Sequence, residues 1–232
     1  MKGKLIVVEG TDCSGKETQT RLLEERLNSE NIKTKRISFP WYDSPTGKII
    51  GACLLGKPQM CEELLKTEHS FFPEGGGNVD SLVAGCLYGA DRRYNLPMIN
   101  KLLEEGYVLL VDRYVTSNMA HRGGMIESLD DRIKFYKKME LFEYEILELP
   151  RPDMTLLLYL PYEYACELKK HREELPDEAE SNIDYLKRGE SAYLELANLY
   201  NFDVVNCVSD GSIRTIENIN DEVYTKVKKL VK

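Results

Sequence analysis

The feature that most constrains this chain is a glycine-rich segment directly after an apolar run near the N-terminus. Residues 4–9 (KLIVVE) are the kind of short apolar run that forms a buried parallel strand. The next segment, GTDCSGKET, places Gly10, Gly15 and Lys16 at the spacing of the phosphate-loop pattern G-x-x-x-x-G-K-[ST]. Residues 16–29 then carry leucines at helical spacing. A strand, a glycine loop and a helix in this order predict a loop whose backbone N–H groups bind phosphate.

The last position of the pattern is different, because Glu17 stands where a serine or threonine hydroxyl would hold Mg²⁺. Thr18 follows, but one residue along a helix is a rotation of about 100°, so it does not replace that hydroxyl. A carboxylate beside phosphates is repulsive unless Glu17 turns outward or joins the metal ligands. Metal binding would otherwise rest on other carboxylates, of which Asp12 is the nearest. The alternative, a plain glycine turn, would not require Lys16.

Apolar runs alternate with helical segments along the rest of the chain. We expect further strands at 33–38, 107–111, 153–160 and about 202–206. We expect helices at 44–55, 79–105 and about 128–148, another that ends at about residue 200, and one at the C-terminus. This alternation predicts a three-layer α/β fold, a parallel five-stranded sheet with helices on both faces. We expect Pro97 to bend or break its helix and residues 75–77 (GGG) to form a loop. No repeat or linker divides residues 1–232, which predicts a single domain.

Composition limits the partners that the chain can have. A net charge of −8 argues against nucleic acid as the main partner, although a local basic pocket can still hold a small phosphorylated ligand. No apolar stretch approaches the roughly 18 residues that span a bilayer, and no signal peptide is recognisable. The six cysteines are scattered without a C-x-x-C pair, which favours reduced thiols in a cytoplasmic protein that binds no membrane. They are Cys13, Cys53, Cys61, Cys86, Cys166 and Cys207.

A second motif, VDRYVTSN at 111–118, ends the most apolar predicted strand, where an open α/β sheet binds ligands. Together with the glycine loop, this motif resembles the thymidylate kinase (dTMP kinase) family, and further matching segments cover nearly the whole chain. They are FP at 39–40, GADR at 89–92, RPDMTL at 151–156 and YLELA at 193–197. The charged stretch at about 167–182 lies where the family has its lid. The resemblance implies the P-loop nucleoside monophosphate kinase fold.

The resemblance also implies roles for individual residues. ATP would be bound by Gly10, Thr11, Asp12, Cys13, Ser14, Gly15, Lys16, Glu17 and Thr18, and dTMP by Asp12, Phe39, Pro40, Tyr88, Arg92, Arg113, Asn118, His121 and Glu180. Arg113 would hold the 5′-phosphate, Arg92 the base carbonyl and phosphate region, Asn118 the thymine edge, and Tyr88 would stack on the base. Mg²⁺ would be held by Asp12, Asp112 and Glu180. The implied catalytic residues are Lys16, Arg113, Arg172 and Asp12.

Simpler alternatives exist for several of these residues. Asp112 and Arg113 could form only a strand-end ion pair, Tyr88 could belong to the core, and Glu180 could be an ordinary acid at a helix N-terminus. Arg93, beside Arg92, is expected on a solvated helix face.

Three departures from the family pattern matter. Phe39-Pro40 is followed by Trp41-Tyr42, without the arginine that many members have. His121 stands where many members have a tyrosine associated with rejecting a 2′-hydroxyl, so discrimination between sugars is left open. Cys13 stands where one class of the family has a catalytic arginine in the loop. Its presence points to the other class, in which the lid supplies the positive charge, and Arg172 is the first candidate for that role.

The expected reaction is in-line phosphoryl transfer from MgATP to dTMP, giving dTDP and ADP. Two alternatives remain from the sequence: another deoxynucleoside monophosphate or nucleoside kinase of the same fold, and a nucleotide-binding protein that has lost catalysis. The family is usually dimeric, so a homodimer is expected.

Overall fold

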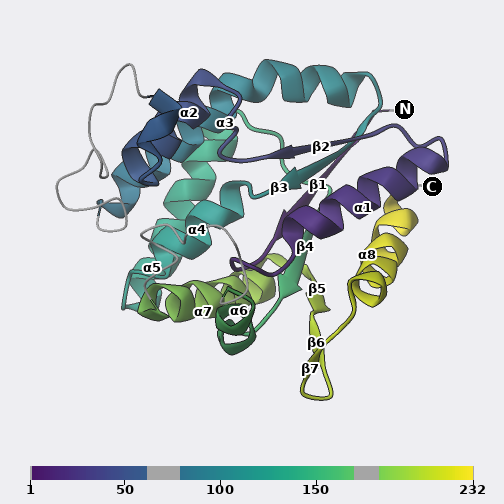
Figure 1. Ribbon diagram of the computed structural model, residues 1–232. Helices are drawn as coiled ribbons and strands as arrows, with labels where there is room; N and C mark the ends of the chain where they lie inside the picture. The colour runs from purple at the N-terminus through teal and green to yellow at the C-terminus, as the bar shows by residue number, and fades with distance from the viewer. Residues whose placement is uncertain (1, 62–78, 170–182, 232) are drawn as a thin grey trace.

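The computed structural model describes residues 2–61, 79–169 and 183–231. Its centre is a parallel five-stranded sheet with the strand order β2-β3-β1-β4-β5 (Figure 1). The strands are β1 Lys4–Glu9, β2 Thr34–Ser38, β3 Val108–Asp112, β4 Met154–Tyr159 and β5 Asp203–Asn206. A small antiparallel pair, β6 Val208–Ser209 and β7 Ser212–Ile213, follows β5. The predicted fold class and the number of strands in the main sheet are therefore confirmed.

Helices cover both faces of this sheet. They are α1 Lys16–Ser29, α2 Pro45–Leu54, α3 Ser81–Glu104, α4 Val115–Gly123, α5 Leu129–Glu140, α6 Tyr162–Lys169, α7 Ile183–Tyr200 and α8 Ile216–Leu230. A 3-10 helix spans Pro58–Cys61, and a π-helix spans Leu141–Ile146 directly after α5. No helix in the described ranges is both long and apolar enough to cross a membrane.

Side chains of β1 point alternately to the two faces of the sheet and join the hydrophobic cluster on each face. Leu5 and Val7 join a cluster that extends into α3, α4, α5 and α7, while Ile6 and Val8 join a cluster that extends into α1, α6 and α8. Successive strand side chains point to opposite faces, so a strand buried on both sides reads as a continuous apolar run. Figure 1 shows α8 lying beside α1 on its face of the sheet. The three layers follow from this division.

The strand register brings three chain segments to one edge of the sheet. Val8 pairs with Asp112 across β1 and β3, and Ser38 pairs with Asp112 across β2 and β3. The loops after β1, β2 and β3 therefore start at the same level. The connections also change direction beside β1, since β3 lies on one side of it and β4 on the other. Open α/β sheets bind ligands at such a switch point.

The structure decides between two alternatives in one place and corrects an expectation in another. The helix expected to bend or break at Pro97 does not break there, because α3 continues from Ser81 to Glu104. Proline removes one N–H donor, and the buried Leu96 and Ile99 on either side of it hold both halves of the helix in the core. The strand expected at 107–111 lies one residue later, because the Tyr107 N–H closes a turn onto Leu102 and ladder bonding begins at Val108.

Several elements were not expected from the sequence. Helix α4 is buried at all but one of its nine positions, so it shows no amphipathic period that sequence reading could detect. Helix α6 occupies a charged stretch and overlaps the start of the expected lid at 167–182. The β6–β7 hairpin is too short for a recognisable pattern. The glycine run 75–77 and most of the lid lie outside the described residues.

Candidate active site

The loop between β1 and α1 has the backbone that its two glycines require. Gly15 has φ 83° and caps α1, in the left-handed region where a side chain is disfavoured. A Cβ atom at Gly10 would lie 2.5 Å from the Ser14 hydroxyl oxygen and 2.7 Å from the Leu158 carbonyl oxygen. Cys13 adopts φ 63° without being glycine. The tight loop leads directly into the α1 N-terminus, where free backbone N–H groups and the helix dipole favour anions.

Lys16 is buried beneath this loop. Its Nζ donates to the carbonyl oxygen of Thr11 at 2.8 Å. Burial lowers its pKa, as does the nearby Arg113, while Asp112, Asp12 and Glu9 act in the opposite direction. A phosphate bound in the loop would add negative charge beside this amine and favour its protonated form.

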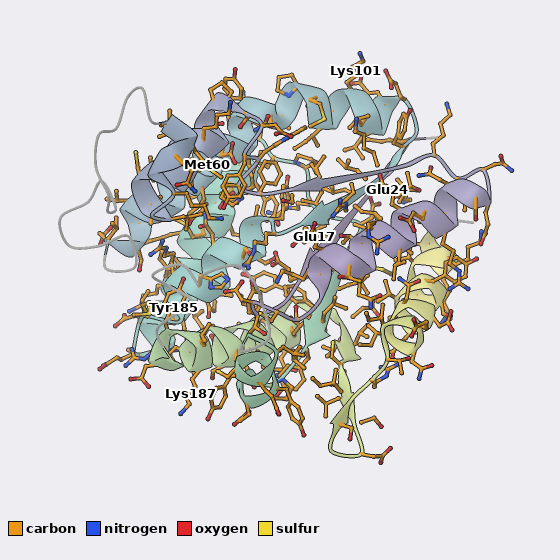
Figure 2. The ribbon with its side chains drawn as sticks, in the orientation of Figure 1. Glu17, Glu24, Met60, Lys101, Tyr185 and Lys187 are labelled. Atoms are coloured by element: carbon orange, nitrogen blue, oxygen red, sulfur yellow. The ribbon has the colours of Figure 1, made fainter. Side chains whose placement is uncertain are left out.

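Glu17, the residue that departs from the phosphate-loop pattern, is largely exposed to solvent although it also lines the open cavity described below. Its side chain is 85% exposed, and its nearest ion-pair partner is Arg36 on β2, with Nη1 3.8 Å from Oε1. Figure 2 shows Glu17 at the start of α1. The repulsion between this carboxylate and bound phosphates is therefore weakened by solvent and by Arg36.

Arg113 joins the phosphate loop to the rest of the site. It follows β3 with φ 64°, and its Nη2 donates to Oδ1 of Asp12 in the loop. Its Nη1 lies 2.8 Å from Nε2 of His121 on α4. Burial acts to lower the pKa of Arg113, but Asp12 and other anionic neighbours hold it well above its ordinary value. This guanidinium is thus a permanent cation, held from two sides.

His121 accepts the Arg113 hydrogen bond, which requires an unprotonated Nε2. Its ring stacks on Tyr185 and meets Tyr193 edge-on, with ring centroids 5.7 Å and 5.6 Å away respectively. Burial, and then the charge of Arg113, lower the pKa of His121 to about 3. The imidazole is therefore neutral at physiological pH.

Two buried oxygens near the loop have no hydrogen-bond partner among the described residues: Oδ1 of Asp112 and Oγ of Ser14. Unpaired buried oxygens of this kind fit hard cations such as Mg²⁺, which prefer carboxylate oxygen, water and phosphate ligands. No cluster of three or more candidate ligands occurs within residues 2–61, 79–169 and 183–231. Asp112 is therefore compatible with a metal that is bound mainly through nucleotide phosphates.

A cavity of about 700 Å³ opens beside the loop. Phe39 and Pro40, joined by a cis peptide bond, form one wall after β2, and Tyr88 on α3 forms another. Asp91 on α3 anchors the segment after β2, accepting hydrogen bonds from Trp41 and three further groups. The volume lies in the range of small-molecule ligand sites.

Arg92 and Asn118 both line the cavity and share one hydrogen-bond partner. Glu143, on the π-helix, is fully buried and accepts from Nε of Arg92 at 2.5 Å and from its Nη2 at 2.7 Å. The Asn118 amide donates to Oε1 of the same carboxylate at 3.0 Å. Arg93, in contrast, is partly exposed and pairs with Glu148 at the surface, as expected.

Most of the predicted site residues meet in this single cavity. Its lining includes Asp12, Cys13, Gly15, Lys16, Glu17, Thr18, Phe39, Pro40, Tyr88, Arg92, Asp112, Arg113, Asn118 and His121. Gly10, Thr11 and Ser14 shape the loop without lining the cavity, and Arg172 and Glu180 lie outside the described residues. Sequence reasoning missed the lining residues Tyr42, Leu55, Lys57, Ser117, Arg122, Leu168 and Tyr185. It also missed Glu143, which carries no motif signal.

A phosphate loop at the switch point of a parallel sheet, facing a cavity lined with arginines, defines a P-loop nucleotide kinase. Residues 8–219 match the thymidylate kinase family, so the chain belongs to that family.

Individual relatives agree with this assignment. Thymidylate kinase from Plasmodium falciparum is 27% identical over 229 residues, covering 99% of this chain and 91% of the relative. The Pseudoalteromonas translucida enzyme is 29% identical over 217 residues, covering 94% and 88%. The solved structure of thymidylate kinase from Candida albicans has the same fold, with a TM-score of 0.73 at 23% identity, covering 99% and 92%.

Proposed function

We propose that this protein transfers the γ-phosphoryl group of MgATP to dTMP, giving dTDP and ADP. The observation that carries the proposal is the single cavity that joins the phosphate loop to Arg113, Arg92 and Asn118. Membership of the thymidylate kinase family supports thymidylate as the acceptor. The exposed position of Glu17 weakens the main argument for a binding protein without catalysis.

The donor site is formed by the loop from Gly10 to Thr18. Its backbone N–H groups hold the ATP phosphates, and Lys16 leaves the Thr11 carbonyl to contact the β- and γ-phosphate oxygens. When bound with ATP, Mg²⁺ would neutralise charge on these phosphates. Asp112, whose buried Oδ1 has no partner within the described ranges, and Asp12 are the described carboxylates that would hold this ion.

The acceptor site lies across the same cavity. Arg113 binds the 5′-phosphate of dTMP, and Asp12 and His121 hold the guanidinium in place for it. Arg92 and Asn118 contact the base, while Phe39, Pro40 and Tyr88 enclose it. Fixed hydrogen-bonding groups of this kind lower the entropic cost of aligning the two phosphates.

The reaction requires no general base, because the acceptor phosphate is already an anion. Catalysis then consists of alignment and of charge stabilisation by Lys16 and Arg113. We propose that the segment 167–182 forms a lid that adds Arg172 to the transferring group and Glu180 to the acceptor and metal region. Residues 1–232 act as one domain in a cytoplasmic homodimer.

Turnover measurements test this proposal. We expect ADP release from ATP and Mg²⁺ to be fastest with dTMP among a panel of nucleoside monophosphates. Lys16→Ala should lower kcat by about 100-fold or more, because the variant loses a buried cation that acts on the transferring phosphate.

Lys48→Ala is the matched control, since Lys48 is an exposed lysine on α2, and its rate should stay near that of the wild type. Turnover with a different monophosphate would overturn the thymidylate assignment. Wild-type protein that binds ATP but turns over no acceptor would overturn the kinase proposal.

A further inference from the structure

Glu143 is a buried carboxylate for which the proposed reaction has no use. It has no exposed surface and does not line the cavity, yet it contacts two side chains that do, those of Arg92 and Asn118. Arg92 donates to both of its oxygens, and Asn118 donates to one of them. Burying a carboxylate is costly unless it is paired and hydrogen-bonded, and here three donors satisfy it.

Glu143 determines which end of the Asn118 carboxamide faces the ligand. The Asn118 Nδ2 group donates to Glu143 Oε1 at 3.0 Å and to the Gly85 carbonyl oxygen at 3.1 Å. The reversed amide would place an acceptor oxygen against two other acceptors, which is repulsive. The Asn118 Oδ1 atom makes no hydrogen bond within the described chain and is not enclosed. Asn118 therefore presents a hydrogen-bond acceptor to the cavity.

The same carboxylate determines what Arg92 can present. Glu143 accepts hydrogen bonds from both Nε and Nη2 of Arg92, and this bidentate ion pair fixes the plane of the guanidinium. Nη1 makes no hydrogen bond within the described residues, and Arg92 lines the cavity. Arg92 therefore offers N–H donors beside the Asn118 acceptor, while its charge is balanced from behind.

The local fold brings Glu143 this close to α3. Gly85 and Gly89 lie one turn apart on α3, and a Cβ atom at Gly89 would come within 2.8 Å of Phe142 and 2.9 Å of Leu147. Phe142 belongs to the π-helix, whose wider turn contains Glu143, and Leu147 follows directly after it. A larger residue at Gly89 would therefore push the π-helix away from α3, while a Cβ atom at Gly85 would lie 2.8 Å from the sulfur of Met139 on α5. The carboxylate is thus held by packing as well as by its hydrogen bonds.

We propose that Glu143 is a positioning residue that selects the acceptor base by holding Asn118 as an acceptor and Arg92 as a donor. The matching ligand face is a ring N–H beside a carbonyl, as in thymine or uracil. Cytosine presents an unprotonated ring nitrogen beside an amino group, which opposes both protein groups. This inference rests on the proposed function, because it assumes that the acceptor base contacts Asn118 and Arg92.

Glu143→Gln tests the inference with little change in side-chain size. One carboxylate oxygen becomes an amide donor that faces another donor, and the orientation of Asn118 then depends on the Gly85 carbonyl alone. We expect the KM for dTMP to rise about tenfold, with little change in the KM for ATP. The preference for dTMP over dCMP in kcat/KM should fall by about tenfold or more. Glu143→Asp, which keeps the charge, should recover part of this preference.

Glu145→Gln is the matched control, because Glu145 lies on the same π-helix but is exposed and pairs only with Arg151 among the described residues. It should keep the wild-type preference. A merely structural Glu143 would lower the melting temperature of Glu143→Gln while leaving the ratio between dTMP and dCMP unchanged, and that result would overturn the inference. Wild-type enzyme that fails to use dTMP would instead count against the proposed function itself.

A measurement on the wild type covers the case in which the variants do not fold. Both amide protons of Asn118 are donated to buried acceptors, so NMR with asparagine labelled at nitrogen should show them exchanging slowly before any ligand is added. They should stay slow when dTMP binds, because the ligand meets Oδ1. Rapid exchange in the free protein would overturn the inference.

Discussion

At the residue scale, Arg113 is the side chain where the two halves of the site meet. Its partners come from different elements, Asp12 from the loop after β1 and His121 from α4. Its left-handed backbone at the end of β3 directs the chain from the sheet into α4. One residue thus links strand order, loop conformation and the proposed phosphate contact.

His121 leads to a prediction about pH. Its pKa is about 3 in the folded protein and about 6.5 when unfolded, so below pH 6.5 the unfolded chain binds more protons. Stability should therefore fall as pH falls, with a contribution on the order of 1 kcal/mol between pH 6.5 and about pH 5. Denaturant unfolding of the wild type and of His121→Gln, which keeps an acceptor for Arg113, measures this contribution. Identical pH slopes for the two proteins would contradict the assignment.

At the element scale, the segment after β2 depends on α3 for its position. Asp91, which has no exposed surface, accepts from Trp41 N at 2.8 Å, Ser44 Oγ at 3.0 Å and Thr46 Oγ1 at 2.6 Å. It thereby fixes the turn between Phe39 and α2. The proposed wall of the acceptor pocket is thus attached to α3, the helix that carries Arg92, which fixes the distance between this wall and the proposed base contact.

Removing this anchor should affect the acceptor more than the donor. Asp91→Ala leaves several buried donors without a partner and should lower the free energy of unfolding by about 2–4 kcal/mol. We expect the KM for dTMP to rise several-fold while the KM for ATP changes little. Asp43→Ala, on the exposed side of the same segment, is the control and should have little effect. Equal increases in both KM values would show that the anchor does not act on the acceptor wall alone.

At the scale of the whole molecule, the buried Glu9 ties the central strand to two helices. It accepts from Thr116 Oγ1 at 2.6 Å and Ser117 Oγ at 2.9 Å on α4, and from the Tyr193 hydroxyl at 3.2 Å on α7. The phosphate loop starts at the next residue. The sheet edge, α4 and α7 therefore form one support for the proposed donor and acceptor sites.

This shared support predicts how much a ligand that binds both sites stabilises the protein. A bisubstrate analogue that joins adenosine to thymidine through phosphates should contact the loop and the acceptor pocket together. At 100 times its Kd it should stabilise the protein by about 2.7 kcal/mol, which corresponds to roughly 5–10 °C in Tm. Thermal unfolding with the analogue, with ATP alone and with dTMP alone provides the comparison. Lys16→Ala should reduce the shift, and an unchanged shift in that variant would contradict the donor-site assignment.

Local patterns in the sequence are sufficient to predict much of this protein's fold and of its candidate site. The apolar runs of β1, β3 and β4, the glycines at 10 and 15 and the arginines at 92 and 113 identify the fold class, the loop and most of the cavity lining. Each of these signals lies within a few residues, since strand burial and loop geometry impose local requirements on residue type.

Only the tertiary structure decides which partner each side chain has. The sequence shows Glu17 at the metal-binding position of the loop, but its exposed position depends on the helix surface and on Arg36 from the neighbouring strand. In the sequence, Glu143 is one acidic residue among many. It lies 51 residues from Arg92 along the chain, and only folding brings the two side chains within hydrogen-bond distance. A short motif specifies backbone shape, whereas the direction of a buried polar side chain is set by partners that packing brings from distant parts of the chain.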